Sequence, residues 1–464
     1  MLSREDNDLL CRVSPGTPMG DLMRQYWMPA MLSRELGEPD CPPKRIRLLG
    51  ESLVAYRDTD GRVGLLADNC PHRGASMFFG RNEEAGLRCV YHGWKFDRTG
   101  ACVDMPNEPP ESNFKNKVRI GAYPCVERGG VIWAYMGPHA TPPPLPELEW
   151  NLVPEGQRFI SMRWQECNWG QAFEGGIDSS HSSFLHSPLV AHRSRAEDYD
   201  KAPELAGGPM ASYGVRGDSP GTRGMIYKAR DKHPRFEVVD TDYGVLIGAR
   251  RDAEPDTYYW RITQFLLPFY TMIPSYGESP VIGGHAWVPI DDEHTMTWSI
   301  SWHPTRPLTD RELFVLQDYP RSGIHPGVPG GLLPATSEPY GAWRPKDNKS
   351  NDYGRDMELE RTKLFSGIPN LAIQDSAMQE TMGAIYDRTK EHLGSSDTGI
   401  IQTRRRLINA AKALRDGGIT PPGAENPGAY RVRSAGVVLP RSAAWVQAAG
   451  EFLQATPGVH HASA

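Results

Sequence analysis

The spacing of hydrophobic positions changes several times along the chain. Residues 14–28 place apolar side chains at helical spacing, which predicts a short amphipathic helix. From about residue 44 to 138, short apolar runs alternate with turn residues such as Asp60-Gly61, and this pattern predicts β-strands, the last over 131–138. The proline-rich stretch 141–146 (TPPPLP) predicts a boundary between two regions.

A larger region follows these prolines. Residues 172–186 are predicted to be helical, and the apolar runs of 236–303 predict several antiparallel strands. Residues 305–355 are rich in proline, glycine and polar side chains, which predicts a long loop or lid. Helical spacing returns at 369–390 and at 400–415, whereas the tail beyond about residue 415 carries no pattern that predicts a role.

Together these patterns predict an α+β protein with a small all-β domain and a larger domain whose antiparallel sheet is flanked by helices. The predicted divisions are residues 1–43 as an N-terminal helical lead that packs on the larger domain, 44–145 as the small domain and 146–464 as the larger domain. A chain of 464 residues is long enough to bury a large core.

Charge and cysteine content narrow the classes of function. The formal net charge is −6, so no basic field is present to hold nucleic acid. No apolar run approaches the ~18 residues that a membrane helix needs. Residues 1–11 lack the apolar core of a secretory signal, so we expect a cytoplasmic protein. Seven cysteines are few and odd in number, which in a reducing compartment favours metal ligation over disulfides.

Two cysteine–histidine pairs mark the first candidate site. Cys70-Pro-His72 is followed, after sixteen residues, by Cys89-Val-Tyr-His92. Two thiolates and two imidazoles are the ligands of a Rieske [2Fe-2S] cluster, whose raised reduction potential suits an electron relay. A four-ligand zinc site is the alternative. The flanking runs RGAS (73–76) and GWKF (93–96) match Rieske ligand loops and favour the cluster.

A second candidate site begins in the run EGGIDSSHSSFLH, residues 174–186, where Asp178, His181 and His186 follow the pattern Asp-x2-His-x4-His. Non-haem Fe(II) oxygenases hold iron with two histidines and one carboxylate, which leaves positions open for O2 and substrate. Asp375, within an apolar-periodic segment, is the predicted carboxylate, although a helix N-cap is another role for it. The rival acids are Glu380, Asp387 and Asp397.

The order of these motifs resembles the catalytic α-subunit of Rieske non-haem iron ring-hydroxylating oxygenases. More narrowly, residues 174–186, 261–274 (RITQFLLPFYTMIP) and 374–397 (QDSAMQETMGAIYDRTKEHLGSSD) resemble the phthalate 4,5-dioxygenase subgroup, which includes aryl O-demethylase-like members. The resemblance covers roughly residues 14–410. It implies that 44–145 is the Rieske domain and 146–464 the catalytic mononuclear iron domain.

The resemblance also implies roles for individual residues. The cluster ligands would be Cys70, His72, Cys89 and His92, and the Fe(II) ligands His181, His186 and Asp375. Asp178 would hydrogen-bond His92 of one subunit and His181 of its neighbour, and so connect the two centres. Asn168 is expected either beside the iron ligands or as a helix cap. The family further implies a ring of three subunits, or two stacked rings, without a β-subunit.

The implied reaction is the O2-dependent cis-dihydroxylation of an aromatic carboxylate such as a phthalate-like acid. Its electrons would come from NAD(P)H through a separate flavin- and ferredoxin-type reductase. Arg250 or Arg251 is the expected anchor for the carboxylate, with Ser179 as a polar contact. The alternatives are a monooxygenase that O-demethylates a methoxylated aromatic, a non-catalytic Rieske electron-transfer protein and a zinc-stabilised binding protein.

Overall fold

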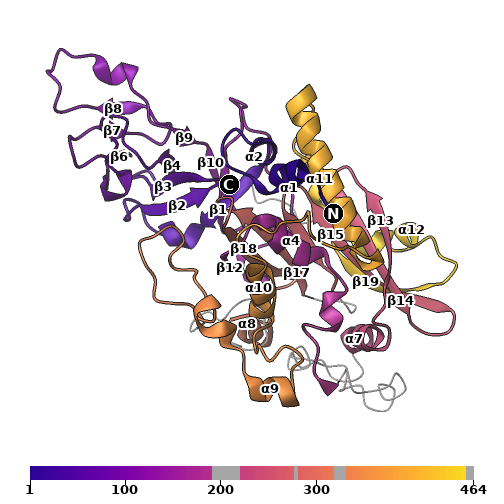
Figure 1. The fold of residues 1–464 in the computed structure, drawn as a ribbon. Coiled ribbons are helices and arrows are strands. Elements are labelled where there is room, and N and C mark those ends of the chain that lie inside the picture. The colour runs from indigo at the N-terminus through magenta and orange to yellow at the C-terminus, as the bar shows by residue number, and fades with distance from the viewer. Residues whose placement is uncertain (191–219, 276–280, 318–330, 456–464) are drawn as a thin grey trace.

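The computed structural model describes residues 1–190, 220–275, 281–317 and 331–455. Strands β2 to β9 form a compact unit that extends to one side of a large sheet and its helices (Figure 1). Helices α1 (Arg4–Cys11) and α2 (Pro18–Arg24) pack against α11 (Thr398–Gly417). The N-terminal segment therefore lies on a helix formed near the other end of the chain.

The smaller unit is built from antiparallel strands in two four-stranded sheets. Its own core includes Val54, Leu66 and Phe96 together with the buried Cys70 and Cys89. The first sheet contains β2 (Lys44–Leu48), β3 (Glu51–Arg57), β4 (Val63–Ala67) and β9 (Ala122–Tyr123). The second contains β5 (Arg81–Glu83), β6 (Gly86–Arg88), β7 (Lys95–Phe96) and β8 (Cys102–Asp104). A further sheet is formed by β1 (Trp27–Leu32), β11 (Val131–Tyr135) and β10 (Cys125–Arg128).

The larger unit is organised around an eight-stranded antiparallel sheet, as the apolar runs of 236–303 predict. In spatial order its strands are β12 (Arg158–Gln165), β18 (Thr295–Trp302), β17 (Ile282–Pro289), β16 (Tyr270–Ile273), β15 (Thr257–Leu266), β14 (Gly244–Asp252) and β13 (Arg235–Asp240), while β19 (Ala435–Pro440) also pairs with β15. The strand β19 lies in the tail for which the sequence predicted no role.

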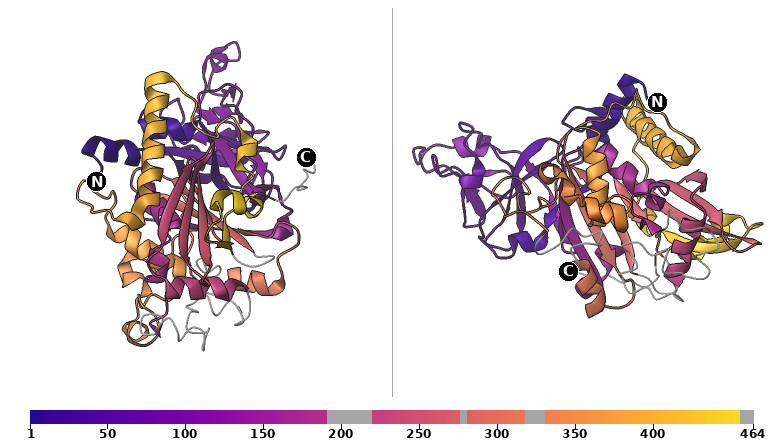
Figure 2. Two further views of the ribbon diagram at one scale, coloured as in Figure 1. Left: turned by 90° about the vertical axis from the view of Figure 1, so that its right-hand side faces the viewer. Right: turned by 60° about the horizontal axis from the view of Figure 1, so that its bottom comes forward.

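Helices cover the sheet on one face and shape the space for a site. Helix α4 (Trp169–Ile177) buries Trp169, Phe173 and Ile177 and packs on β16 and β17, and α10 (Leu371–Thr381) packs on α4. Helix α11 runs along the sheet beside β13 and β14 (Figure 2). The other α-helices in the described part of the chain are α3 (Glu149–Leu152), α7 (Pro220–Arg230), α8 (Asp310–Gln317), α9 (Met357–Thr362) and α12 (Trp445–Ala448).

Three predicted helices are wrong in extent. The helix predicted over 14–28 is α2, which begins with Pro18 at its first position and is capped by Thr17; β1 starts at Trp27 because that segment pairs with β11. The helix predicted over 172–186 is α4, which ends at Ile177 after two successive glycines. The stretch 369–390 forms α10 only as far as Thr381, whereas the helix predicted at 400–415 is confirmed as α11.

The predicted loop of 305–355 is partly wrong. It contains α8 and a short 3-10 helix over Lys349–Gly354, and its residues 318–330 lie outside the described part of the chain. Among the described residues, no helix has both the length and the apolar character needed to span a bilayer.

Candidate metal centres

Two loops with the same backbone conformation present the cysteine–histidine pairs. In each loop the amide of a glycine donates to the cysteine carbonyl four residues earlier, Gly74 to Cys70 at 2.8 Å and Gly93 to Cys89 at 2.9 Å. Both glycines have positive φ values, +75° and +81°, which residues with a Cβ rarely adopt. The repeated glycine therefore sets the two cysteines in equivalent positions.

The side chains of these loops are arranged with sulfur inside and imidazole outside. Cys70 and Cys89 are buried, whereas the rings of His72 and His92 are partly exposed and lie 4.4 Å apart between centroids. Burial raises the pKa of the Cys70 thiol to about 11, and the adjacent Cys89 adds to this shift. Desolvation, with a smaller effect from His72, lowers the pKa of His92, which favours the neutral imidazole that a metal needs.

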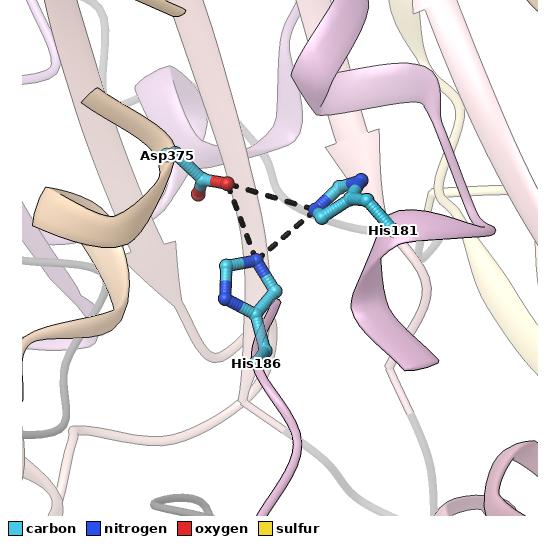
Figure 3. Close-up of side chains that lie close together, drawn as sticks. All are labelled: His181, His186 and Asp375. Carbon is cyan, nitrogen blue, oxygen red and sulfur yellow. Dashed lines mark hydrogen bonds and ion pairs between the residues drawn. The ribbon is translucent and has the colours of Figure 1, made fainter. Parts of the chain in front are cut away.

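Three side chains from two separate segments converge at the second centre (Figure 3). His181 Nε2 and His186 Nε2 lie 3.0 Å apart, and Asp375 Oδ1 lies 3.6 Å and 3.2 Å from them. All three ligand atoms lie within 4.8 Å of one another. Two imidazole nitrogens and one carboxylate oxygen at this spacing fit the donor set of a non-haem iron site.

The local fold explains this convergence. His181 opens a 3-10 turn, His181–Ser183, that follows α4, and His186 comes after that turn. The two histidines therefore do not share the continuous helix that was predicted. Asp375 lies inside α10, whose N-cap is Asn370, so the predicted alternative of an N-cap for Asp375 is wrong. Burial alone would raise the pKa of Asp375, but His186, His181 and Arg163 hold it at about 2.

Neighbouring polar groups orient both imidazoles. His186 Nδ1 lies 2.6 Å from Gln374 Oε1, and Gln374 Nε2 donates to the Ile368 carbonyl at 2.7 Å, which fixes the direction of the amide. His181 Nδ1 lies 3.3 Å from Asp178 Oδ2. In both histidines Nδ1 therefore faces an acceptor and Nε2 faces the common point. The sequence analysis did not identify Gln374, although its position directly before Asp375 was a usable signal.

The predicted substrate contacts and Asn168 lie in different surroundings. Arg251 is buried and donates to Ser179 Oγ and to the Ser179 carbonyl, at 3.3 and 3.1 Å, so these two side chains do meet. Arg250 instead lies over the ring of Tyr258, 4.5 Å from its centroid. Asn168 is the N-cap of α4 and accepts from the Gly170 amide at 2.9 Å, which matches the helix-cap alternative for this residue.

The rival acids have other partners. Glu380 accepts a hydrogen bond from the Tyr353 hydroxyl at 2.9 Å, and Asp387 accepts from Thr389. Asp397 accepts from the Gly394 amide at 2.7 Å. Of the four acids considered, Asp375 is the one that lies between the two histidines.

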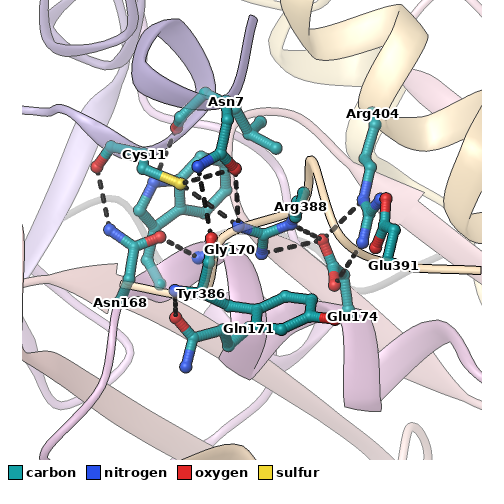
Figure 4. A network of polar contacts seen from close by, with 12 residues as sticks. Asn7, Cys11, Asn168, Gly170, Gln171, Glu174, Tyr386, Arg388, Glu391 and Arg404 are labelled. Carbon is teal, nitrogen blue, oxygen red and sulfur yellow. Dashed lines mark hydrogen bonds and ion pairs between the residues drawn. The ribbon is translucent and has the colours of Figure 1, made fainter. Parts of the chain in front are cut away.

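A buried ionic network supports the helix that leads to Asp178 (Figure 4). Arg388 and Arg404 both bind the carboxylate of Glu174 on α4, at 3.1 Å and 2.8 Å. Arg388 also donates to Asn7 and contacts the Cys11 sulfur, so α1 is tied to the same point. Arg404 is paired with Glu391 as well. The sequence analysis missed this network because single charged residues carry no spacing signal.

Comparison with known proteins agrees with both centres. A family model described as a Rieske [2Fe-2S] domain matches residues 26–124, and a model described as LigXa C-terminal domain like matches residues 134–460. Among solved structures, the NdmA QL mutant of Pseudomonas putida CBB5 with theobromine has the same fold. Its TM-score is 0.54 at 17% identity, over 88% of this chain and 96% of that one.

Three curated relatives align along most of their length. The 3-chlorobenzoate-3,4-dioxygenase oxygenase subunit of Comamonas testosteroni is 40% identical, over 96% of this chain and 97% of that protein. The phthalate 4,5-dioxygenase oxygenase subunit of Pseudomonas putida is 37% identical, over 90% and 88%. The 5,5'-dehydrodivanillate O-demethylase oxygenase subunit of Sphingobium is 34% identical, over 90% and 82%.

The chain therefore belongs to the Rieske non-haem iron ring-hydroxylating oxygenases, as an oxygenase subunit. It is an oxidoreductase with a Rieske [2Fe-2S] cluster and a mononuclear iron centre, and it receives electrons from a separate component. Oxygenase subunits of such multicomponent dioxygenases work with an aromatic substrate, O2 and a ferredoxin or reductase partner. These findings confirm the predicted class and fold.

Proposed function

We propose that Cys70, His72, Cys89 and His92 hold the [2Fe-2S] cluster, and that His181, His186 and Asp375 hold Fe(II). The observation that carries the second assignment is the convergence of three ligand atoms within 4.8 Å, from segments almost 190 residues apart in the chain. The equivalent loops around Cys70 and Cys89 support the first assignment.

The chain's own residues prepare the iron site for its reaction. When bound there, Fe(II) supplies O2 activation and the cluster supplies single electrons. Asp178 and Gln374 accept hydrogen bonds from the Nδ1 atoms and hold both rings with Nε2 toward the metal. The two imidazoles and the single carboxylate leave other positions free for O2 and substrate.

We assign an aromatic carboxylate as the substrate class and cis-dihydroxylation as the reaction. The names of two relatives, which act on 3-chlorobenzoate and phthalate, support this assignment. O-demethylation of a methoxylated aromatic is the second candidate, favoured by the third relative. Ser179, Arg250 and Arg251 stay predictions as substrate contacts. As arranged here, Arg251 uses its nitrogens on Ser179 and on the Asp231 carbonyl.

The test is to purify the protein and measure iron, sulfide, the visible spectrum and substrate-dependent O2 uptake with a surrogate reductase. We expect a coloured protein with about three irons per chain, two of them in the cluster, that consumes O2 with an aromatic acid. A folded but colourless, iron-free protein would support the zinc alternative. A coloured protein without the mononuclear iron or O2 uptake would support the electron-transfer alternative.

We further propose a head-to-tail ring of three subunits, or two stacked rings, in which Asp178 connects His181 to His92 of the partner subunit. Exposed apolar side chains beside the cluster, Val90 and Tyr91, and near the iron site, Phe184 and Met378, suit such an interface. Replacing Asp178 with alanine is expected to abolish turnover even at saturating Fe(II), where both metals stay bound although the iron is held less tightly. We place the protein in the cytoplasm and its electron source in an NAD(P)H-dependent flavin- and ferredoxin-type reductase.

A further inference from the structure

A fully buried cation, Arg163, lies under the iron site and has no ionic partner among the described residues. Arg163, on β12, is 1% exposed. Within the described ranges, its Nε and Nη1 atoms have no hydrogen-bond partner, and Nη2 has one contact, at 3.3 Å with Gln165 Oε1. In the part of the chain that the structure describes, no carboxylate lies within 4.0 Å of the guanidinium. Burying such a charge without hydrogen bonds is unfavourable.

The guanidinium lies in the layer between the sheet and α10. Arg163 and Gln165 share one face of β12, and Gln165 bonds to Gln379 on α10 at 2.7 Å. On the adjoining strands of that face, His285 and Ser299 are buried, with Nδ1 and Oγ 3.3 Å apart. Gln379 lies one helical turn after Asp375 on α10, so its bond to Gln165 places the face of β12 that carries Arg163 beside the iron site.

The charges around this interior do not balance once iron is bound. Fe(II) with two neutral imidazoles and the carboxylates of Asp375 and Asp178, the second of which lies against His181, carries no net charge, so Arg163 leaves one net positive charge beside the site. Besides Asp375, the acid that acts on Arg163 is Glu380, whose pKa burial raises to about 7, so it offers at most a partial negative charge at neutral pH. His285 stays neutral, because burial and Arg163 lower its pKa to about 4. The interior therefore carries an unbalanced positive charge that an anion can neutralise.

We propose that Arg163 binds the carboxylate of the aromatic substrate, with His285 and Ser299 forming the polar floor around it. This inference rests on the proposed function. It implies that the substrate is an anion whose carboxylate is bound from the side of the sheet. The free donors of Arg163 supply the hydrogen bonds, and the carboxylate supplies the missing negative charge. The alternative, that Arg163 only holds Asp375 in place, predicts an effect on iron rather than on the charge of the ligand.

The experiment compares two probes that differ in charge, 3-chlorobenzoate and the neutral 3-chlorobenzamide. Their dissociation constants are measured by anaerobic calorimetry on reduced holoenzyme of known iron content. In Arg163→Gln we expect the dissociation constant of 3-chlorobenzoate to rise by at least about tenfold, while that of 3-chlorobenzamide changes by less than about twofold. Arg163→Lys keeps the charge and should lose less. Arg158→Gln, on the same strand but the opposite face, is the matched control and should bind both probes like the wild type.

Equal weakening of both probes, or of neither, in Arg163→Gln overturns the proposal. A wild-type holoenzyme that prefers the amide, or that binds none of 3-chlorobenzoate, benzoate and phthalate, overturns it too. If Arg163→Gln fails to fold or to hold iron, Arg163→Lys decides: a selective loss of 3-chlorobenzoate supports the proposal, and none overturns it. Failure of the proposed function would appear instead as missing iron or O2 uptake in the wild type.

Discussion

At the scale of single residues, the hydrogen bond from His186 to Gln374 decides how firmly iron is held. Replacing Gln374 with leucine removes the acceptor but keeps the volume, so the ring is no longer held in one orientation. We expect iron affinity to fall by about 10- to 100-fold, measured by competition with a chelator. Gln379→Leu is the control. Gln379 lies on the same helix as Gln374, and its replacement breaks a buried hydrogen bond to Gln165 on β12 but no hydrogen bond to either histidine. Equal losses in both variants would contradict this role.

Glu380 makes a prediction about pH. Burial raises its pKa to about 7 from the ordinary 4.5, so between pH 4.5 and 7 the folded state binds more protons than the unfolded state. The stability of the wild type should therefore fall as pH rises through this range and level off above pH 7. Glu380→Gln should remove that contribution and gain up to roughly 3 kcal/mol over the wild type at pH 8. Thermal unfolding across pH checks this. Glu358→Gln, at an exposed position, is the control. If the curves of stability against pH ran parallel for the wild type and Glu380→Gln, the prediction would be contradicted.

What could be predicted at this scale depended on spacing. The cluster pairs and Asp178, His181 and His186 stand in short, recognisable runs, so they could be found without a structure. Asp375 could be chosen among four acids because it stands in an apolar-periodic segment, where an acid without a partner would be costly to bury. Arg163 was not found, because one arginine in the strand RFISMRWQ does not indicate which face is buried or what lies above it.

At the scale of elements, α4 positions Asp178 and His181 through its close approach to the sheet. A Cβ at Gly176 would lie 2.6 Å from Thr271 Oγ1 and 2.9 Å from the Trp287 ring, both of which are buried and bonded to each other. Gly176→Ala should destabilise the fold by about 1–2 kcal/mol, since overpacking exceeds the gain in helix propensity. Urea unfolding measures this. Gly156→Ala meets no atom within 4 Å and is the control; a stabilised Gly176→Ala would show that α4 has room to shift.

The extents of elements were harder to predict than their existence. The apolar spacing of 14–28 runs through Trp27, but pairing with β11 outweighs helix propensity there. The strands of the large sheet between residues 236 and 303 were predicted correctly because long apolar runs there are separated by clear turns, whereas β12 was not predicted. The run AGVVLP of β19 had a strand-like composition that was overlooked in a tail without other signals.

At the scale of the whole molecule, the cluster and the iron site lie in separate units of one chain, and the proposed ring brings them together between subunits. Co-expression of Cys70→Ala, which lacks the cluster, with His186→Ala, which lacks the iron site, tests this. Mixed rings should regain roughly a quarter of the wild-type rate. Half of their subunits keep the iron site, and half of those lie next to a neighbour that keeps the cluster. Each variant alone should be inactive. Inactive mixed rings would show that electrons pass within one chain.

The strand β19 has a consequence for anyone who shortens this protein. It pairs with residues 257–262 of β15, the part of that edge that β16 leaves uncovered, and Trp445 behind it stacks on Trp260 at 4.9 Å. A chain cut after α11 would keep every proposed metal ligand, but it would expose an unpaired edge of β15 beside Trp260 and Ile262. Such an edge recruits other chains, so a minimal version that looks complete by its ligands should precipitate.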